Sequence, residues 1–304
     1  MDLVGIGVSV LDVLMVVDGL PREESVVRAE RCGVGLGGGV AVAMATAARL
    51  GCQAALLDRL GHDHASDLIV EALQSSGVDV AALQRHDGTT ASLANVWVDS
   101  ASGSRTIVFA PGQDIDLTWC DVFETLVADA KVLHLSGRHA AASHRAIDVA
   151  RRAGTLVSYD GGAHRYRKAI DSLFRRCNLA IVARQFAETF FRDTRHTAPP
   201  EPEGLARFLV DEIGCVLAGV TDGQRGSWFA GGDGDAFHQP AVAADPVCDT
   251  TGCGDVFHGA FLAGLVRGES FREAAVLAAR VAAANAENLG ALGFSAERFR
   301  QLGT

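Results

Sequence analysis

The sequence predicts an α/β protein with three layers: a mainly parallel central sheet, helices on both of its faces, and in addition a small β-sheet set apart from it. Short apolar runs alternate along the chain with segments that have the 3.6-residue spacing of helices. These runs are almost continuously apolar, which is typical of strands buried on both faces of a parallel sheet. Two further stretches, within 13–32 and 91–110, look like strands but have no helix between their runs.

The main elements are expected in a regular order. Strands are expected at residues 2–7, 54–57, 132–135, 155–159, 179–182 and 215–220. Helices are expected between them at 40–50, 63–76, 121–130, 143–153 and 203–213, and two more close the chain at about 254–267 and 271–289. The Pro- and Glu-rich residues 199–204 are typical of an exposed loop.

The small sheet is predicted from four strand-like runs. Residues 91–110 hold two of them around a Ser/Gly turn, which predicts a hairpin. Residues 13–17 and 26–32 are also strand-like, and the second run alternates apolar and polar residues. We expect the segments at about 12–36 and 90–111 to form a lid over a pocket, inserted in a single domain of residues 1–304.

Composition narrows the class of partner. The 304 residues include 27 Lys+Arg and 37 Asp+Glu, so the net charge is 27 − 37 = −10. With 48% hydrophobic and 21% charged residues, the chain has the composition of a folded globular protein. It has no run of basic residues, so it lacks the charge distribution of a protein that binds nucleic acid. A small-molecule partner is therefore expected.

The chain shows no sign of a membrane or secreted location. The apolar residues 1–20 contain Asp2, Asp12 and Asp18, and they predict neither a signal peptide nor a membrane span. The seven cysteines are scattered and include no C-x-x-C pair, so neither a disulfide framework nor a zinc site is predicted. We expect a cytoplasmic protein.

A glycine-rich segment matches a dinucleotide-binding pattern. Residues 33–38, Gly-Val-Gly-Leu-Gly-Gly, fit G-x-G-x-x-G, and Asp58 follows 20 residues later. That site requires a buried strand leading directly into the glycines, whereas residues 28–31 are largely charged and the nearest expected buried strand before them is 2–7. An NAD-binding oxidoreductase is kept as an alternative from a different class.

The segment Asp249-Thr250-Thr251-Gly252-Cys253-Gly254-Asp255 carries the strongest chemical signal, because an apolar helix follows it at once. Small residues at a helix start leave backbone N–H groups accessible, and the helix dipole adds positive charge there. Residues 252–254 therefore predict an anion hole for a phosphate-like group. Asp255, in the first helical turn, is placed to accept a proton from an attacking hydroxyl. The alternative is a carboxylate that only stabilises its own helix.

This segment resembles the D-T-x-G-A-G-D signature of the ribokinase-like (PfkB) sugar kinase family, and further motifs follow in family order over nearly the whole chain. Asp12 matches an Asp that binds sugar hydroxyls in this family. Gly37-Gly38 and the helix after them are similar to the glycine signature that approaches the sugar. Residues 220–226, Val-Thr-Asp-Gly-Gln-Arg-Gly, resemble the nucleotide loop V-T-x-G-x-x-G.

The resemblance implies an ATP-dependent sugar kinase with a ribokinase-like three-layer α/β/α fold and a β lid. In this family ATP donates its γ-phosphate, Mg²⁺ shields it, the anion hole holds the developing charge, and the residue matching Asp255 deprotonates the acceptor. Nucleotide contacts are expected at Thr221, Gly223, Gly226, Thr250 and Asn285. For Asn285 the alternative is a buried amide bonded to backbone. A monovalent cation such as K⁺ beside Asp249 and a homodimer through the lid are further expectations.

The chain departs from the family pattern at three places. Val42 stands where the family usually has Asn, which implies an atypical acceptor. The N-x-x-E motif that organises water around Mg²⁺ would fall on residues 184–187 and is absent, with Glu188 out of register. Cys253 replaces the Ala of G-A-G-D. Because a helix N-terminus lowers a thiol pKa, Cys253 is predicted to be a reactive cysteine that ATP protects.

Arg138 points to an anionic acceptor. It follows the strand at 132–135, at the sheet edge where such folds bind ligands, and a guanidinium suits sulfonate, phosphate or carboxylate. A solvated loop arginine is the alternative. V-x-G-L-P near the start and DTTGCGDVFHGA resemble the 6-deoxy-6-sulfofructose kinase branch, in which an Arg in the matching loop helps to hold the sulfonate. The partner Asn of that branch is matched here by Phe109.

Two other polar residues have more than one interpretation. Asp160 ends the strand at 155–159, where it is a candidate contact for the metal or the phosphates, or a cap for the glycine turn after it. His258 lies in an otherwise apolar helix and is expected to be structural.

Several functions remain open within and outside the kinases. The acceptor is an anionic sugar such as a sulfo- or phosphosugar, a neutral sugar, a keto-deoxy sugar acid, or a nucleoside, which would need aromatic residues such as Trp97 and Phe109 near the lid. Outside the kinases, two alternatives remain: the oxidoreductase and a catalytically silent nucleotide-binding relative. Val42 and the missing N-x-x-E motif favour the silent relative, whereas the intact residues 249–255 argue against it.

Overall fold

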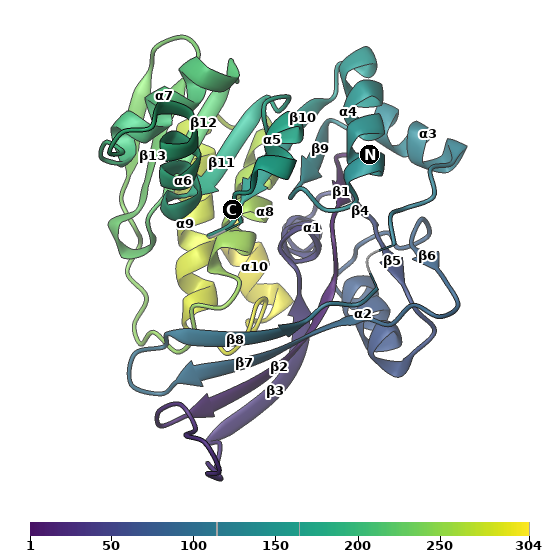
Figure 1. The fold of residues 1–304 in the computed structure, drawn as a ribbon, viewed down its shortest axis with the longest axis vertical. Helices are drawn as coiled ribbons and strands as arrows, with labels where there is room; N and C mark the ends of the chain where they lie inside the picture. Colours follow the sequence, from purple (N-terminus) through teal and green to yellow (C-terminus); the bar gives the residue numbers. More distant parts are fainter. Residues whose placement is uncertain (114, 164, 304) are drawn as a thin grey trace.

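The central sheet has eight strands in the order β14-β13-β12-β11-β10-β9-β1-β4 (Figure 1). The structure, a computed structural model, describes residues 1–113, 115–163 and 165–303. The six strands from β12 to β4 in this order pair in parallel: β1 (Leu3–Ile6), β4 (Ala54–Leu57), β9 (Val132–Leu135), β10 (Leu156–Gly161), β11 (Leu179–Ala183) and β12 (Leu217–Thr221). β13 (Ser227–Gly231) and β14 (Ala236–Gln239) add an antiparallel edge. The predicted mainly parallel α/β fold is confirmed.

Helices cover both faces of this sheet. One face carries α1 (Gly39–Arg49), α2 (His64–Ser75), α8 (Cys253–Val266), α9 (Phe271–Ala286) and α10 (Ala296–Leu302). The other carries α3 (Asp121–Asp129), α4 (Ala140–Ala153), α5 (Asp171–Phe174), α6 (Arg184–Arg195) and α7 (Pro202–Ile213). Ile181 and Val182, adjacent in β11, pack into the opposite cores, which explains why such strands are apolar throughout. Within the described residues, no helix is long and apolar enough to cross a membrane.

A four-stranded sheet, called the small sheet below, stands apart from the main one (Figure 1). It consists of β3 (Arg31–Gly37), β2 (Val10–Val17), β7 (Ser92–Asp99) and β8 (Arg105–Ala110), in that order. β2 and β7 are parallel, and the other pairs are antiparallel. The hairpin predicted at 91–110 is confirmed. Two short strands, β5 (Arg59–Leu60) and β6 (Gln84–Arg85), pair elsewhere.

The strand predicted at 26–32 is wrong, since β3 covers Arg31–Gly37 and most of 26–30 is exposed. Its glycines Gly33, Gly35 and Gly37 pair with alternate residues of β2, so from Gly33 onward one face of β3 has no side chains to produce an apolar signal. The G-x-G-x-x-G pattern thus lies largely inside an antiparallel strand. It is not the turn after a parallel strand that a dinucleotide site needs, and that interpretation is wrong.

Three further predictions need correction. The loop predicted at 199–204 ends earlier, because α7 begins at Pro202, a residue suited to the first helical position. The last long helix ends at Ala286 rather than 289. Helix α6 and the antiparallel strands β13 and β14 were not predicted at all.

Candidate active site

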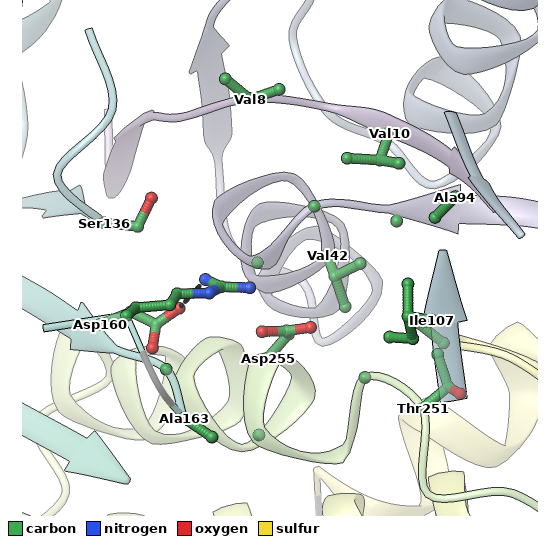
Figure 2. Close-up of a pocket in the computed structure, with 18 of the residues that line it drawn as sticks. Val8, Val10, Val42, Ala94, Ile107, Ser136, Asp160, Ala163, Thr251 and Asp255 are labelled. Atoms are coloured by element: carbon green, nitrogen blue, oxygen red, sulfur yellow. Dashed lines mark ion pairs between the residues drawn. The ribbon is translucent and has the colours of Figure 1, made fainter. Parts of the chain in front are cut away.

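A cavity of about 640 Å³ lies between the edge of the main sheet and the small sheet (Figure 2). Each of five parallel strands contributes to it at or just after its carboxyl end: Val8, Ser136, Asp160, Ala183 and Thr221. The small sheet contributes residues of β2, β7 and β8. Ligands of open α/β sheets bind at this edge, so the cavity is the candidate active site.

Most of the predicted site residues line this cavity, namely Asp12, Gly37, Gly38, Arg138, Asp160, Thr221, Gly252, Gly254 and Asp255. Thr250, Cys253, Asp249, Asn285, Gly223 and Gly226 are not among its lining residues. Gly223 lies in the short 3-10 turn Gly223–Arg225, and Gly226 follows that turn directly. This turn comes shortly after Thr221 in the chain. The sequence motifs therefore converge on one site, with some of their residues behind its wall.

The start of α8 presents free backbone donors to the cavity. Gly252 is the N-cap, with φ 72°, and no side chain caps the helix. The N–H of Val256 bonds to Gly252 O, whereas those of Gly254 and Asp255 have no acceptor among the described residues. Such N–H groups, with the helix dipole, suit an anion. The arrangement is what residues 252–254 were expected to provide.

Asp249 shapes the loop before α8. Its carboxylate is fully buried and accepts hydrogen bonds from Thr251 N (2.8 Å), Thr251 Oγ1 (2.7 Å) and Gly290 N (2.8 Å). These bonds join two loops next to the cavity. A monovalent cation beside Asp249 stays a prediction.

Two carboxylates meet over the first residue of α1 (Figure 2). A Cβ on Gly39 would lie 2.8 Å from Asp160 Oδ2 and 2.9 Å from Asp255 Oδ1, so glycine leaves the space that both carboxylates use. Asp160 also lies 3.3 Å from His258 Nε2 and 3.6 Å from Arg165 Nη1. Asp255 has no ion-pair partner among the described residues.

The two acids have opposite pKa shifts. Burial and the negative charge of Asp160 raise the pKa of Asp255, against a smaller lowering by Arg165. Burial alone would raise the pKa of Asp160, but the charges of His258 and Arg165 hold it below its ordinary value. Neighbouring carboxylates with divergent pKa values are typical of sites that transfer protons. Asp255 is therefore the better proton acceptor.

The expectation that His258 is structural stays a prediction, although the residue lies at the site. It lies one helical turn after Asp255, lines the cavity and pairs with Asp160. Behind it, His134 is fully buried with its ring centroid 5.3 Å from that of His258, and burial lowers the pKa of His134 to about 3. His134 thus stays neutral, so the carboxylate of Asp160 is the main charge facing His258.

The prediction of a reactive thiol at Cys253 is wrong. Its side chain points away from the cavity, where Sγ donates to Ala282 O at 3.5 Å. Burial raises the pKa of the Cys253 thiol to about 11, which outweighs the effect of the helix N-terminus. Cys253 therefore remains a protonated packing residue.

Asn285 lies behind the loop of the anion hole. It is fully buried; its Nδ2 donates to Thr251 O at 2.8 Å, and its Oδ1 accepts from Leu292 N at 2.9 Å. These bonds support the alternative of a buried amide bonded to backbone, and they hold the segment that carries Gly252.

Asp12 faces the cavity from β2. A Cβ on Gly37 would collide with its carboxylate, and no described residue donates a hydrogen bond to it. Burial, with the charges of Asp255 and Asp249, raises the pKa of Asp12 to about 7. A buried acceptor without donors is suited to bind hydroxyl groups of a ligand.

Two arginines at the site were not singled out in the sequence. Arg105, in β8, donates from Nη1 to Thr250 Oγ1 at 2.9 Å, which links the small sheet to the loop before α8. Arg165 follows β10 and pairs with Asp160. Both lie close enough to Asp255 to oppose the rise in its pKa. A single arginine on a strand or in a loop belongs to no sequence motif, so these contacts could not be predicted from the sequence.

The carboxylates near the cavity do not form a metal cage. Asp160 Oδ2 is buried without a hydrogen bond, but Arg165 and His258 already face this carboxylate. Glu188 and Asp222 bind Arg184 at 2.7 and 3.1 Å. No group of three or more His, Cys, Asp or Glu residues in the described ranges fits a metal ion. A contact from Asp160 to a metal ion stays a prediction.

Comparisons with known proteins show which family the chain belongs to. The ATP-dependent 6-phosphofructokinase of Thermoanaerobacterium thermosaccharolyticum is 26% identical over 80% of this chain and 76% of the relative. Ketohexokinase of Mus musculus is 24% identical over 91% of this chain and 93% of the relative. The crystal structure of a putative ribokinase from Agrobacterium tumefaciens superposes with a TM-score of 0.87, at 22% identity, over 99% of this chain and 97% of that one. The model of the pfkB family carbohydrate kinases matches residues 2–297, and the chain therefore belongs to this family.

Proposed function

We propose that the protein transfers the γ-phosphate of ATP to a hydroxyl of a small sugar that carries a negatively charged group, such as a sulfo- or phosphosugar. As a pfkB family carbohydrate kinase, it is a phosphotransferase with an alcohol group as acceptor. The observation that carries the finer proposal is Arg138, an exposed residue that lines the cavity after β9 with no carboxylate of the described residues in ion-pair distance. A guanidinium without a counter-ion suits an anionic acceptor.

The site residues divide the chemistry between them. ATP enters as its Mg²⁺ complex beside Thr221, with its γ-phosphate at the N–H groups of Gly254 and Asp255. The Asp255 carboxylate accepts the proton of the acceptor hydroxyl, whose oxygen bonds to the γ-phosphorus while the bond to the β-phosphate oxygen breaks and ADP leaves. Arg105 and Arg165 offset the negative charge. Phosphoryl transfer needs this positioning and charge stabilisation more than covalent catalysis.

The acceptor end has one polar and one apolar wall. Asp12 accepts hydrogen bonds from acceptor hydroxyls, while Val10, Val42 and Ile107 form an apolar surface (Figure 2). Because these three side chains are aliphatic, the surface offers contact to C–H groups rather than hydrogen bonds. Val42 among them is fully buried in α1. An acceptor with fewer hydroxyls on that side fits best.

The uncharged acceptors fit less well. A nucleoside would stack on aromatic rings, yet Phe109 is the one aromatic residue among the described residues that line the cavity, and Trp97 does not reach it. A neutral sugar leaves Arg138 without a function. A keto-deoxy sugar acid would bring a carboxylate to Arg138 and belongs to the same anionic class. The name of the 6-phosphofructokinase relative also refers to a phosphosugar.

ADP release from MgATP tests the proposal with D-fructose, D-fructose 6-phosphate, 6-deoxy-6-sulfofructose, 2-keto-3-deoxygluconate and adenosine as acceptors. We expect one anionic sugar to have the highest kcat/KM and Arg138→Gln to remove that preference. Equal turnover of neutral and anionic sugars by the wild type would refute the anionic acceptor. ATP binding without turnover of any acceptor would instead favour a silent relative.

We also infer a homodimer through the outer face of the small sheet, the face turned away from the cavity. Val34 and Val108 are 61% and 56% exposed and lie in one row with Val13 and Asn95. Asn95 Oδ1 is buried without a partner among the described residues. An exposed apolar row with an unsatisfied amide is suited to pack against a second copy.

A further inference from the structure

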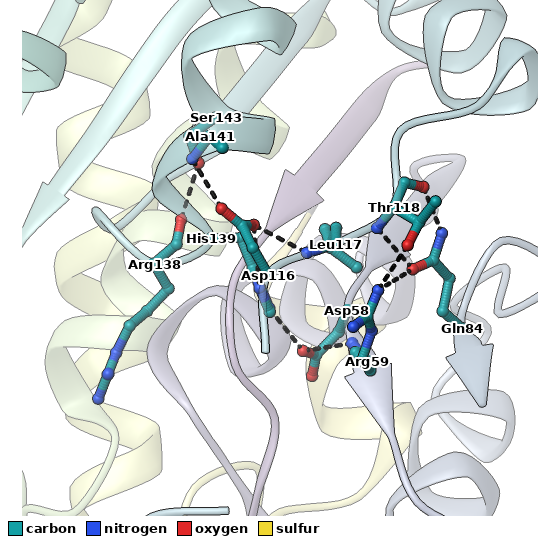
Figure 3. Close-up of polar contacts among 10 residues, drawn as sticks. All are labelled: Asp58, Arg59, Gln84, Asp116, Leu117, Thr118, Arg138, His139, Ala141 and Ser143. Atoms are coloured by element: carbon teal, nitrogen blue, oxygen red, sulfur yellow. Dashed lines mark hydrogen bonds and ion pairs between the residues drawn. The ribbon is translucent and has the colours of Figure 1, made fainter. Parts of the chain in front are cut away.

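The imidazole of His139 lies between two carboxylates from different parts of the chain (Figure 3). Its Nε2 is 3.0 Å from Asp58 Oδ1, and its Nδ1 is 3.6 Å from Asp116 Oδ1. The side chains of His139 and Asp58 are 8% and 1% exposed. Because a carboxylate accepts hydrogen bonds and does not donate them, Nε2 carries the hydrogen of the bond to Asp58. His139, at the start of α4, therefore joins two segments that are far apart in the sequence.

Asp58 connects this histidine to the start of the small sheet. Its Oδ2 accepts a hydrogen bond from Ser9 N at 2.6 Å. Ser9 lies between β1 and β2, where the chain first passes from the main sheet to the small sheet. Its neighbours Val8 and Val10 line the active-site cavity, as does Asp12 further along β2. The orientation of the Asp58 carboxylate thus fixes the point at which β2 leaves the main body.

Asp116 holds the other end of the small sheet. It follows β8, between the last strand of that sheet and α3. Its Oδ2 accepts a hydrogen bond from Ala141 N at 2.8 Å. Since Ala141 lies in the first turn of α4, two residues after His139, Asp116 contacts the same helix start through the imidazole and through a backbone amide. The strand that ends before Asp116, β8, brings Ile107 and Phe109 to the active-site cavity.

His139 also has an unusual backbone conformation. It is the N-cap of α4 with φ 49° and ψ 60°, a left-handed conformation that residues other than glycine rarely adopt, and its ring does not cap the helix. Strain of this kind persists only where surrounding contacts maintain it, and it is common at functional sites. In Figure 3 the His139 ring is turned toward Asp58, whereas the side chain of its neighbour Arg138 extends away from this network.

We propose that His139 is a positioning residue for the acceptor: through Asp58 and Asp116 it holds the small sheet on the main body where that sheet begins and ends. His139 is not among the described residues that line the active-site cavity, so it acts on the acceptor only through β2 and β8. The inference concerns any acceptor that these two strands contact, and it does not depend on the charge of the acceptor.

His139→Gly removes the ring with little disturbance of the backbone, because glycine adopts a positive φ without strain. The matched control is His196→Gly, since His196 is also a left-handed histidine at a helix end, with φ 56°, but is exposed after α6. Hydrogen exchange of backbone amides, measured by mass spectrometry, compares both variants with the wild type. We expect residues 7–10 and 115–118 to exchange about 10-fold faster in His139→Gly, the effect of losing a hydrogen bond to a charged group.

The entry of the chain into β7 provides an internal reference for the exchange measurement. Asp63 Oδ2 accepts a hydrogen bond from Ala91 N at 3.1 Å, so this entry is held by a different carboxylate. Residues 89–91 should therefore exchange at the wild-type rate in His139→Gly. In His196→Gly all three regions should exchange as in the wild type.

Steady-state kinetics test the consequence for the acceptor. We expect His139→Gly to raise KM for the best acceptor of the panel above about 10-fold and to leave KM for MgATP unchanged. The change in kcat should be smaller, because the bond from Arg105 to Thr250 still holds β8 at the phosphate end. A loss of stability alone would lower the free energy of unfolding without separating the two KM values.

Added imidazole should restore the acceptor KM of His139→Gly. A second cavity, of about 330 Å³, is lined by Ser9, Asp58 and His139, so free imidazole can reach the position of the missing ring. In His139→Gly/Asp58→Asn, KM should equal that of the worse single variant, since both substitutions break one chain of contacts. Unchanged exchange at 7–10 and 115–118 would overturn the proposal, as would faster exchange with an unchanged acceptor KM. The exchange comparison needs no acceptor, so its result stands whether or not the acceptor is an anionic sugar.

Discussion

Asp255 and Asp160 are the same kind of residue, yet their surroundings give them different properties. Asp160 is held ionised by His258 and Arg165, whereas Asp255 has its pKa raised by burial and by Asp160. We expect Asp255→Asn to lower kcat by about 10²-fold to 10⁴-fold, the usual contribution of a positioned base. Steady-state ADP release measures this, with the exposed Asp211→Asn as a control. A variant with near-normal kcat would contradict the assignment.

Acceptor binding is expected to depend on pH through Asp12. With a pKa of about 7, Asp12 is increasingly protonated below that pH and accepts hydrogen bonds less well. The acceptor dissociation constant should therefore rise as pH falls through about 7 and level off above it. Calorimetric titration without ATP measures this. In Asp12→Asn the rise should vanish; a rise of equal size would assign the titration to another group.

Thiol labelling provides a test at a third residue. Because the partly buried Cys253 thiol has a pKa raised to about 11, iodoacetamide at neutral pH should leave it unmodified and leave the activity unchanged. Cys32 and Cys120 are exposed and should be labelled first. Mass spectrometry of the labelled protein identifies the sites. Loss of activity in proportion to Cys253 labelling would restore the reactive-thiol interpretation.

At the scale of elements, β8 connects the small sheet to the phosphate end of the site. The bond from Arg105 to Thr250 spans the two parts. Arg105→Gln should lower kcat about 10-fold or more, since it removes both this bond and a positive charge near the transferring phosphate. Arg28→Gln, an exposed charge change in the β2–β3 connection, is the matched control and should have wild-type kinetics. Equal kcat in both variants would argue against this function of β8.

The elements also show what a sequence reveals and what it does not. β9 was predicted with its bounds because a strand buried on both faces is apolar throughout. β3 was misplaced because its glycines leave one face without side chains. α6 was overlooked although Phe186, Ala187 and Phe190 form a buried stripe, a signal that was available.

The site divides in the same way. Asp255 and its glycines form a contiguous motif, so their common place at the cavity was predictable from the sequence. Arg105 and Arg165 reach the cavity only through strand pairing and loop packing, which local patterns do not encode. The contact of His258 with Asp160 was not predictable, because the two residues lie almost 100 positions apart in the sequence.

At the scale of the whole molecule, the site lies between two bodies of different size. The larger body supplies Asp255 from α8 and Asp160 from β10, while the small sheet lines the other side of the cavity with one face only. Part of its outer face packs on α2 through Leu11 and Leu36, and the remainder holds Val34 and Val108 in the open. A second copy would bury this remainder without closing the cavity.

The homodimer is testable by sedimentation. We expect the wild type to sediment as a dimer at micromolar concentration. The double variant Val34→Lys/Val108→Lys should sediment as a monomer, because dimerisation would bury two lysine charges without partners at the centre of an apolar contact. Val122→Lys, at a valine 58% exposed on α3, should remain dimeric. If kcat/KM also falls in the monomer, the partner steadies the sheet that carries Asp12 and Arg105. A monomeric wild type, or a double variant that still dimerises, would rule out this face as the interface.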